Sequence, residues 1–195
     1  MLFVESDKRI NVTVAGGPCT GKSTLAANLF AHLKNIGFDY DLIEEESRKL
    51  RKEFGDFRSP FERFYMWRQQ EREELRSTAT NGFITDNCLY MYYVKALHYS
   101  RESRDKLAVR ELFRMCTELE DQRRYQLIII AKNPEEIPYK TDQARTSRPE
   151  SALEKHRLIR TFLEHFCNDK LLFVEGNLEQ RLKQSMDKIL AMHGS

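Results

Sequence analysis

The feature that most constrains this chain is a short glycine-rich stretch near its N-terminus. Residues 16–23 read Gly-Gly-Pro-Cys-Thr-Gly-Lys-Ser, which matches the Walker A pattern at every fixed position. An apolar run, Ile10–Ala15, precedes the stretch, and leucines at helical spacing, beginning with Leu25, follow it. A strand, a glycine-rich loop and a helix in this order predict a loop that binds the phosphates of a nucleotide.

Each residue type in the motif has a physical role. Gly16 and Gly21 allow backbone angles that a side chain would forbid, so the loop can wrap around a phosphate. Lys22 brings a positive charge to the β- and γ-phosphates, and the Ser23 hydroxyl is placed to bind Mg²⁺. We therefore expect ATP and Mg²⁺ as cofactors, with nucleotide-binding residues Gly16, Gly17, Pro18, Cys19, Thr20, Gly21, Lys22, Ser23 and Thr24.

Short apolar runs separated by helical patterns define the expected fold. The runs are too continuous for strands with one wet face, and helices between them imply crossover connections and a parallel sheet. The sequence thus predicts a three-layer α/β fold of the P-loop kinase type, with helices on both faces of a five-stranded parallel sheet. The expected strands are Ile10–Ala15, Phe38–Ile43, Gly82–Asp86, Gln126–Ala131 and Leu171–Val174.

Four later stretches are expected to be helical. Ser59, Pro60 and Glu62 form a typical helix start, with a capping serine and the glutamate of a capping box. That helix should run to about Ala79. The other three are recognised by apolar residues at helical spacing, namely Leu107, Phe113, Cys116 and Leu119; Leu153, Ile159, Phe162, Leu163 and Phe166; and Leu178, Leu182, Ile189 and Leu190.

Length and composition indicate one ordinary globular domain spanning residues 1–195. The chain has 195 residues, 32% of them charged, and a net charge of +2, which does not by itself indicate nucleic-acid binding. The four cysteines form no close metal-binding pair and are typical of reduced thiols. With no signal-peptide pattern and no apolar stretch long enough to span a membrane, we expect a cytoplasmic protein without a membrane partner.

Acidic residues follow the second and third expected strands. Residues 44–48 read Glu-Glu-Glu-Ser-Arg, and Asp86 and Asn87 end the third strand. Ligands of doubly wound sheets bind at the carboxyl ends of the strands, so both groups should face the phosphate loop. Asp86 is well placed for a carboxylate near Mg²⁺ or for a base; the alternative is an aspartate that caps the next helix.

The chain resembles the small P-loop kinases related to the nicotinamide riboside kinase domain and, more distantly, the deoxynucleoside kinases. The resemblance covers most of the chain, with Asn87 and Gln143 departing from the usual pattern. It rests on the Walker A stretch, on Glu45-Glu46-Ser47-Arg48, on Asp86, on Asp142-Gln143-Ala144-Arg145, and on Gly176 with Arg181.

This resemblance implies roles for residues outside the loop. Glu45 would contact or deprotonate the acceptor hydroxyl, and Arg48 would hold the acceptor or a phosphate; the alternative for the glutamates is a solvated helix N-terminus. Residues 133–151 would form a lid whose Arg145 and Arg148 reach the phosphates, Lys140 being a weaker member, unless the segment is a plain surface loop. The helix after the second strand would present Trp67 and Gln70 to the acceptor, the alternative for Trp67 being a place in the core.

The acceptor is left open. A nucleoside, a nucleotide or a nucleobase-type hydroxyl all fit, and phage enzymes of this group that phosphorylate 5-hydroxymethyluracil within DNA keep DNA as a further alternative. Basic residues cluster at 49–52 and 101–124, although carboxylates interleave the second cluster, as on a solvated helix face. A nucleotide-binding ATPase or regulatory switch is the rival function. Monomer and homodimer both remain open, and no role is predicted for the five histidines.

Overall fold

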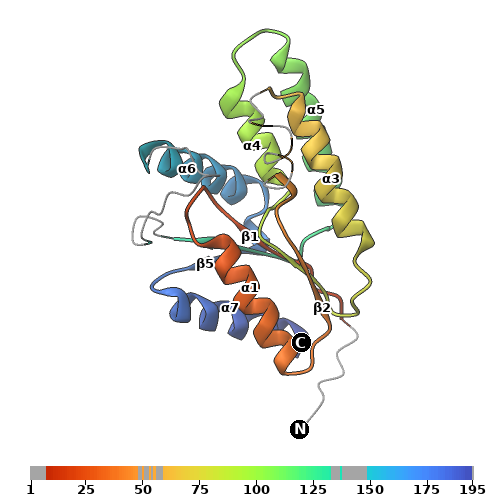
Figure 1. Cartoon of the computed structure of the whole chain (residues 1–195), viewed down its shortest axis with the longest axis vertical. Helices are drawn as coiled ribbons and strands as arrows, with labels where there is room; N and C mark the ends of the chain where they lie inside the picture. Colours follow the sequence, from red (N-terminus) through yellow and green to blue (C-terminus); the bar gives the residue numbers. More distant parts are fainter. Residues whose placement is uncertain are drawn as a thin grey trace.

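The computed structural model describes residues 8–47, 50, 53, 55, 59–132, 137 and 149–194. Each strand is separated from the next by one or two helices (Figure 1). The elements are β1 Val12–Ala15, α1 Lys22–Asn35, β2 Tyr40–Ile43, α3 Glu62–Arg76, β3 Gly82–Thr85, α4 Tyr90–Tyr99, α5 Asp105–Asp121, β4 Leu127–Ala131, α6 Pro149–Phe166, a 3-10 turn Asn168–Lys170, β5 Leu171–Val174 and α7 Leu178–His193.

The strands form one parallel sheet in the order β2-β3-β1-β4-β5. All five expected strands are present, each slightly shorter than or equal to its predicted range. Because β1 is the central strand and β3 and β4 are its neighbours, the loop after β1 lies beside the carboxyl ends of both. The predicted fold class, a five-stranded parallel sheet in an α/β P-loop fold, is confirmed.

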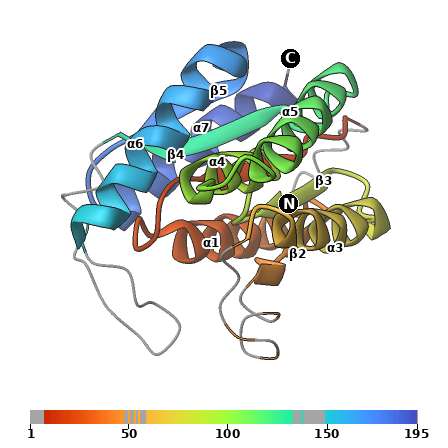
Figure 2. The ribbon, with the colours of Figure 1, turned by 90° about the horizontal axis from the view of Figure 1, so that it is seen from above.

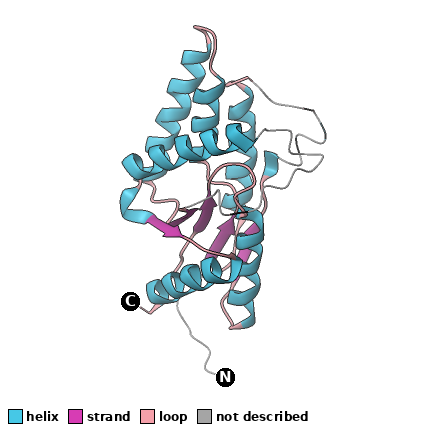
Figure 3. Cartoon of the chain, turned by 90° about the vertical axis from the view of Figure 1, so that its left-hand side faces the viewer, coloured by secondary structure: helices cyan, strands magenta, loops and turns pink. Residues whose placement is uncertain are grey.

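Helices cover both faces of the sheet, which gives three layers (Figures 1 and 3). On one face α1 and α7 pack against alternate strand residues such as Val12, Val14 and Ile129. On the other face α3, α4, α5 and α6 pack against residues such as Phe83, Ile128 and Ile130. Alternate residues of β4 thus enter opposite cores, which explains why the strand sequences are apolar throughout.

The helices differ from the expectations in three respects. Leu107 and Phe113 of α5 and Leu190 of α7 are exposed, at 59%, 42% and 37%, so they do not belong to the core stripes of their helices. The helix expected to reach about Ala79 ends at Arg76. Helix α4 was not expected, because its run of tyrosines and apolar residues carries no clear one-sided pattern.

Of the two hydrogen bonds of the predicted capping box, the start of α3 has the one from the Ser59 N–H to Glu62. The Glu62 carboxylate accepts a hydrogen bond of 2.8 Å from the Ser59 N–H, whereas the Ser59 hydroxyl accepts from the Phe61 N–H at 3.2 Å. Among the described residues, no helix has both the length and the apolar character needed to cross a membrane.

Candidate nucleotide and acceptor site

The phosphate-binding loop connects β1 to α1 with the backbone that the motif predicts. Gly16 has a φ of 135° and Gly21 a φ of 71°, both in the left-handed region that favours glycine. Helix α1 begins at Lys22, directly after Gly21, so its free N–H groups open toward the loop. Cys19 also has a positive φ, of 61°, which costs energy for a residue with a side chain and marks a tightly determined loop.

The peptide groups of Gly17 tie the loop together. Its carbonyl oxygen accepts hydrogen bonds from the Lys22 Nζ at 2.8 Å and from the Thr20 Oγ1 at 3.0 Å. Its N–H donates to the Nδ1 of His156 on α6, at 3.3 Å. Lys22, predicted to meet the phosphates, is therefore held over the loop by the carbonyl of Gly17, and the N–H of the same residue is held by His156.

Three helices support the loop from outside it. A Cβ added to Gly17 would lie 2.6 Å from the carbonyl oxygen of Ala152, so α6 packs directly on the loop. The N–H of Gly16 donates to the sulfur of Met91 on α4, at 3.4 Å. The buried guanidinium of Arg181 on α7 donates to the Thr20 carbonyl at 3.4 Å. Burial lowers the pKa of Arg181.

Asp86 lies at the end of β3, the strand beside β1. Its side chain is buried, and its Oδ1 has no hydrogen-bond partner within the described residues. Asn87 is also fully buried, and its Nδ2 donates to the Tyr92 hydroxyl at 2.7 Å. A buried carboxylate oxygen without a donor is costly unless a cation completes its surroundings, which suits a place near Mg²⁺. The alternative role for Asp86, capping α4, receives no support, because α4 has no side-chain cap.

Glu45 follows β2, at the edge of the sheet next to β3. Its Oε1 accepts a hydrogen bond from the Ser47 hydroxyl and lies 3.4 Å from the Nζ of Lys95 on α4. Both charged side chains are mostly covered, at 15% and 21% exposure. The pair ties the end of β2 to α4, on the same side of the sheet as α6.

The predicted acceptor residues on α3 point into the protein. Gln70 is fully buried; its Oε1 accepts from the Glu46 N–H at 3.2 Å and its Nε2 donates to the Thr85 hydroxyl at 3.1 Å. Trp67 is 1% exposed and packs against Tyr92, with ring centroids 6.5 Å apart. In this structure Gln70 joins α3 to the ends of β2 and β3, and Trp67 belongs to the core, as the alternative interpretation held.

Other predicted residues lie outside the described residues, namely Arg48, Lys140, Arg145 and Arg148, as does most of the expected lid. In the second basic cluster, Arg104 pairs with Glu102 at 2.8 Å, and Arg114 pairs with Glu111 and Glu118. These pairings match the alternative of a solvated helix face.

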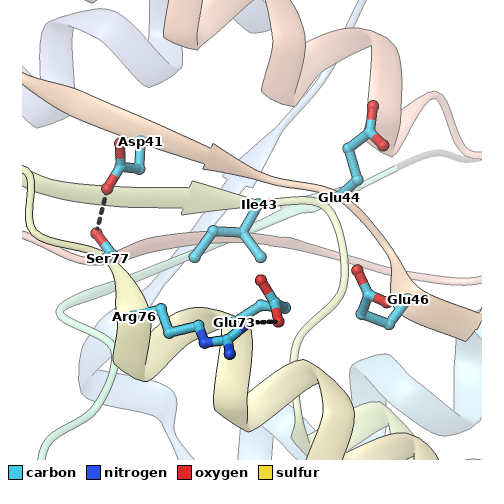
Figure 4. A pocket seen from close by; sticks show the side chains of 7 residues that line it. All are labelled: Asp41, Ile43, Glu44, Glu46, Glu73, Arg76 and Ser77. Carbon is cyan, nitrogen blue, oxygen red and sulfur yellow. Dashed lines mark hydrogen bonds and ion pairs between the residues drawn. The ribbon is translucent and has the colours of Figure 1, made fainter.

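A pocket of about 220 Å³ lies between β2 and α3 (Figure 4). Its residues are Asp41, Ile43, Glu44, Glu46, Glu73, Arg76 and Ser77. The Asp41 carboxylate accepts from the Ser77 hydroxyl, and Glu73 pairs with Arg76. Four carboxylates around one hollow would repel the phosphates of a nucleotide, so this pocket is not the nucleotide site.

The parallel sheet, the strand–loop–helix unit and the Walker A residues together define a P-loop nucleotide-binding domain. Residues 11–181 match the model of the family AAA_28, described as an AAA domain, and the chain belongs to that family.

Solved structures share this fold. A NadR protein in complex with NAD and AMP-PNP superposes with a TM-score of 0.71 at 22% identity, over 96% of this chain and 50% of the NadR chain. NadR in complex with NR gives 0.65, also at 22% identity, over 98% and 52%. A deoxyadenosine kinase from M. mycoides with products dCMP and dCDP bound gives 0.61 at 14% identity, over 94% and 100%.

The chain therefore spans about half the length of the NadR proteins. Comparison with curated protein sequences gives no match.

Sequence reasoning missed the contribution of α6. His156 occupies the buried stripe of this helix together with Ala152, Ile159 and Leu163. A histidine at a core position of an amphipathic helix is a signal that the sequence did contain, because a buried imidazole needs a polar partner. The partner, the N–H of Gly17, lies 139 residues away in the chain and could not be read from spacing.

Proposed function

We propose that this protein is an ATP- and Mg²⁺-dependent kinase that transfers the γ-phosphate to a hydroxyl of a nucleoside, nucleotide or nucleobase-type acceptor. The observation that carries the proposal is the loop with Lys22 held over it, next to the end of β3, which supplies Asp86. The end of β2, one strand further out in the sheet, supplies Glu45. The fold that the chain shares with a deoxyadenosine kinase supports the same reaction class.

The residues present fit a magnesium ion. Mg²⁺ is usually bound by one or two protein oxygens together with phosphate oxygens and water, and the described residues contain no cluster of three or more His, Cys, Asp or Glu that could hold a metal alone. Ser23 at the start of α1 and the unsatisfied Oδ1 of Asp86 would hold the ion. When bound, it would neutralise charge on the β- and γ-phosphates.

The chain's own residues would then position the reactants. In the transfer, the acceptor oxygen forms a bond to the γ-phosphorus, the bond to the oxygen bridging the β- and γ-phosphates breaks, and its electron pair leaves with ADP. Lys22 would neutralise phosphate charge, as would Arg145 and Arg148 of the expected lid. The hydroxyl proton would pass to the Glu45 carboxylate, which Lys95 and Ser47 hold in place.

The test is transfer of label from γ-labelled ATP to three pools: nucleosides, nucleoside monophosphates, and DNA bearing hydroxymethylated pyrimidines. We expect ATP consumption that depends on an acceptor and a labelled product in at least one pool. Lys22→Ala should reduce transfer at least ~100-fold, while circular dichroism shows an intact fold. Near-normal transfer by the folded variant would remove Lys22 from the mechanism.

The AAA family match favours one rival, a nucleotide-binding ATPase or regulatory switch. Such a protein would hydrolyse ATP at the same rate with or without any acceptor and would label none of the pools. If DNA of any sequence stimulated hydrolysis without labelled DNA, the protein would be a DNA-dependent ATPase.

A further inference from the structure

Three cationic side chains from three helices converge near Tyr99, at the end of α4. The Arg63 guanidinium of α3 lies 5.4 Å from the Tyr99 ring centroid, and the Lys155 Nζ of α6 lies 5.3 Å from the same centroid. Lys95, one helical turn before Tyr99, lies 5.5 Å from the Tyr92 ring and 3.4 Å from Glu45. Helix α4 contacts both α3 and α6, and Figure 2 shows the three helices side by side.

The same three cations affect the pKa of the Tyr99 hydroxyl. Burial acts to raise the pKa of its hydroxyl, but a hydrogen bond from Lys155 opposes this effect. The charges of Lys155, Arg63 and Lys95 act in the same direction as the hydrogen bond, and the pKa lies below its ordinary value. The field around the Tyr99 hydroxyl is therefore one that favours negative charge.

The cluster lies next to the proposed reaction site on two helices: α6, which carries Lys155, and α4, which carries Lys95 and Tyr99. On α6, Lys155 precedes His156, which bonds to the P-loop. On α4, Lys95 lies one turn beyond Met91, which also contacts the loop, and it pairs with Glu45. Lys95, Tyr99 and Lys155 are partly exposed, whereas Arg63 is buried. A ligand could therefore meet two lysines and a hydroxyl, with the guanidinium behind them.

We propose that Lys95, Tyr99 and Lys155, backed by Arg63, form a subsite for a phosphate group carried by the acceptor itself, in addition to the hydroxyl that receives the γ-phosphate. This inference rests on the proposed function and names its substrate class: a phosphate monoester or diester that also bears a free hydroxyl. A phosphate offers several oxygens to donors from different helices. The lysines also offset the repulsion that Glu45 would exert on an anionic acceptor.

The experiment compares acceptors in matched pairs that differ by one phosphate. One pair is a nucleoside and its 3′-monophosphate, both with a free 5′-hydroxyl. The other is 5-hydroxymethyl-2′-deoxyuridine and its 5′-monophosphate, and an oligonucleotide containing the same base supplies phosphate diesters. For each pair we would measure kcat/KM and, by calorimetry with a non-hydrolysable ATP analogue present, the binding constant.

In at least one pair the phosphorylated member should be preferred about 10- to 100-fold, the range that a charge-assisted contact supplies. Lys155→Met and, independently, Lys95→Met should each reduce that preference about tenfold. Lys183→Met is the matched control, because Lys183 is exposed on α7 and pairs with Asp187; it should leave the preference unchanged. Preference for the monophosphate or for the oligonucleotide identifies the source of the phosphate.

Equal kcat/KM and equal binding within every pair would overturn this inference while leaving the proposed kinase function intact. If Lys155→Met changed only the KM for ATP, the inference would also be overturned, since the cations would then bind ATP and not the acceptor. If no acceptor becomes labelled, the proposed function fails. The binding ratios then still decide the subsite, because they do not require turnover.

Discussion

At the scale of single residues, Asp86 and Glu45 differ in what surrounds their carboxylates. Asp86 keeps a buried oxygen for which the described chain supplies no donor. The Glu45 carboxylate already accepts a hydrogen bond from the Ser47 hydroxyl and pairs with the Lys95 ammonium. The first arrangement suits an oxygen that completes the shell of a cation, and the second suits an oxygen that must be oriented toward an acceptor.

We therefore expect Asp86→Asn and Glu45→Gln to reduce transfer by different routes, while ATP binding survives in both. Added Mg²⁺ or Mn²⁺ should partly restore Asp86→Asn. Glu45→Gln should lose at least ~100-fold on its best acceptor if Glu45 acts as a general base. Steady-state kinetics over a range of metal concentrations separate the two variants. A loss of only a few-fold in Glu45→Gln would move the base assignment to another carboxylate.

At the scale of elements, α6 connects the expected lid to the P-loop through His156. The imidazole Nδ1 accepts a hydrogen bond from the Gly17 N–H. Because Gly17 also accepts from Lys22, the position of α6 and that of the lysine are linked through one residue. We regard His156 as a positioning residue for Lys22.

This link predicts different results for two substitutions of His156. Asn offers an oxygen close to the place of Nδ1 and should keep kcat within a few-fold, whereas Phe fills the space without an acceptor. His156→Phe should reduce kcat roughly tenfold, in line with the loss of one oriented hydrogen bond, with a smaller change in the KM for the acceptor. Circular dichroism and kinetics of both variants provide the measurement. Equal losses in Asn and Phe would indicate that His156 only fills space.

A buried carboxyl joins α3 to the start of β4. Tyr125, just before β4, donates to the Glu74 Oε1 at 2.8 Å and accepts from the Leu89 N–H at 3.1 Å. Burial raises the pKa of Glu74 from its ordinary value of 4.5 to about 8, although the hydrogen bond from Tyr125 opposes the shift. The folded protein therefore keeps the Glu74 proton to a higher pH than the unfolded chain does.

This shift predicts a pH dependence of stability. Between pH 4.5 and 8 the unfolded chain releases a proton that the folded protein keeps, so the free energy of unfolding falls as pH rises through this window. The Glu74 shift lowers the free energy of unfolding by a few kcal/mol across this window, with about 5 kcal/mol as the upper limit. Glu74→Gln should remove it and be the more stable protein at pH 8.5. Urea unfolding at pH 5 and pH 8.5 tests this; parallel pH profiles for the two proteins would contradict it.

At the scale of the whole molecule, the nucleotide site depends on both cores. Helices α1 and α7 come from one face of the sheet, and α4 and α6 from the other, and all four contact the P-loop. A ligand bound there should stabilise the entire fold. At 100 times its Kd, MgATP should add ~2.7 kcal/mol and raise Tm by roughly 5 to 10 °C.

Thermal unfolding with increasing AMP-PNP and Mg²⁺ measures this shift. Lys22→Ala should show a much smaller shift, while Lys183→Met, on the surface of α7, should respond like the unchanged protein. A Tm that does not move for the unchanged protein would argue against nucleotide binding at the loop.

The P-loop, the five strands and the three-layer fold follow from the amino-acid sequence alone. These depend on short segments: glycines at fixed spacing, and apolar runs that must be buried on both faces. The carboxyl ends of parallel strands meet at one edge, so the sequence also predicts that Asp86 and the run 44–48 face the loop. The role of Glu45 within that run is implied by the resemblance and stays a prediction. Helix α4 was not predicted, because burial nearly all round its axis leaves no one-sided pattern to recognise.

Which side chains meet at the site depends on how distant segments of the chain pack together. Gln70 has the chemistry of a base-reading residue, yet the packing of α3 turns its amide toward Thr85 and the Glu46 backbone. His156 and Gly17 lie 139 residues apart, and Lys155 and Tyr99 come from different helices. Contacts between distant segments depend on how helices cross the sheet, and sequence spacing along a single helix contains no information about that crossing.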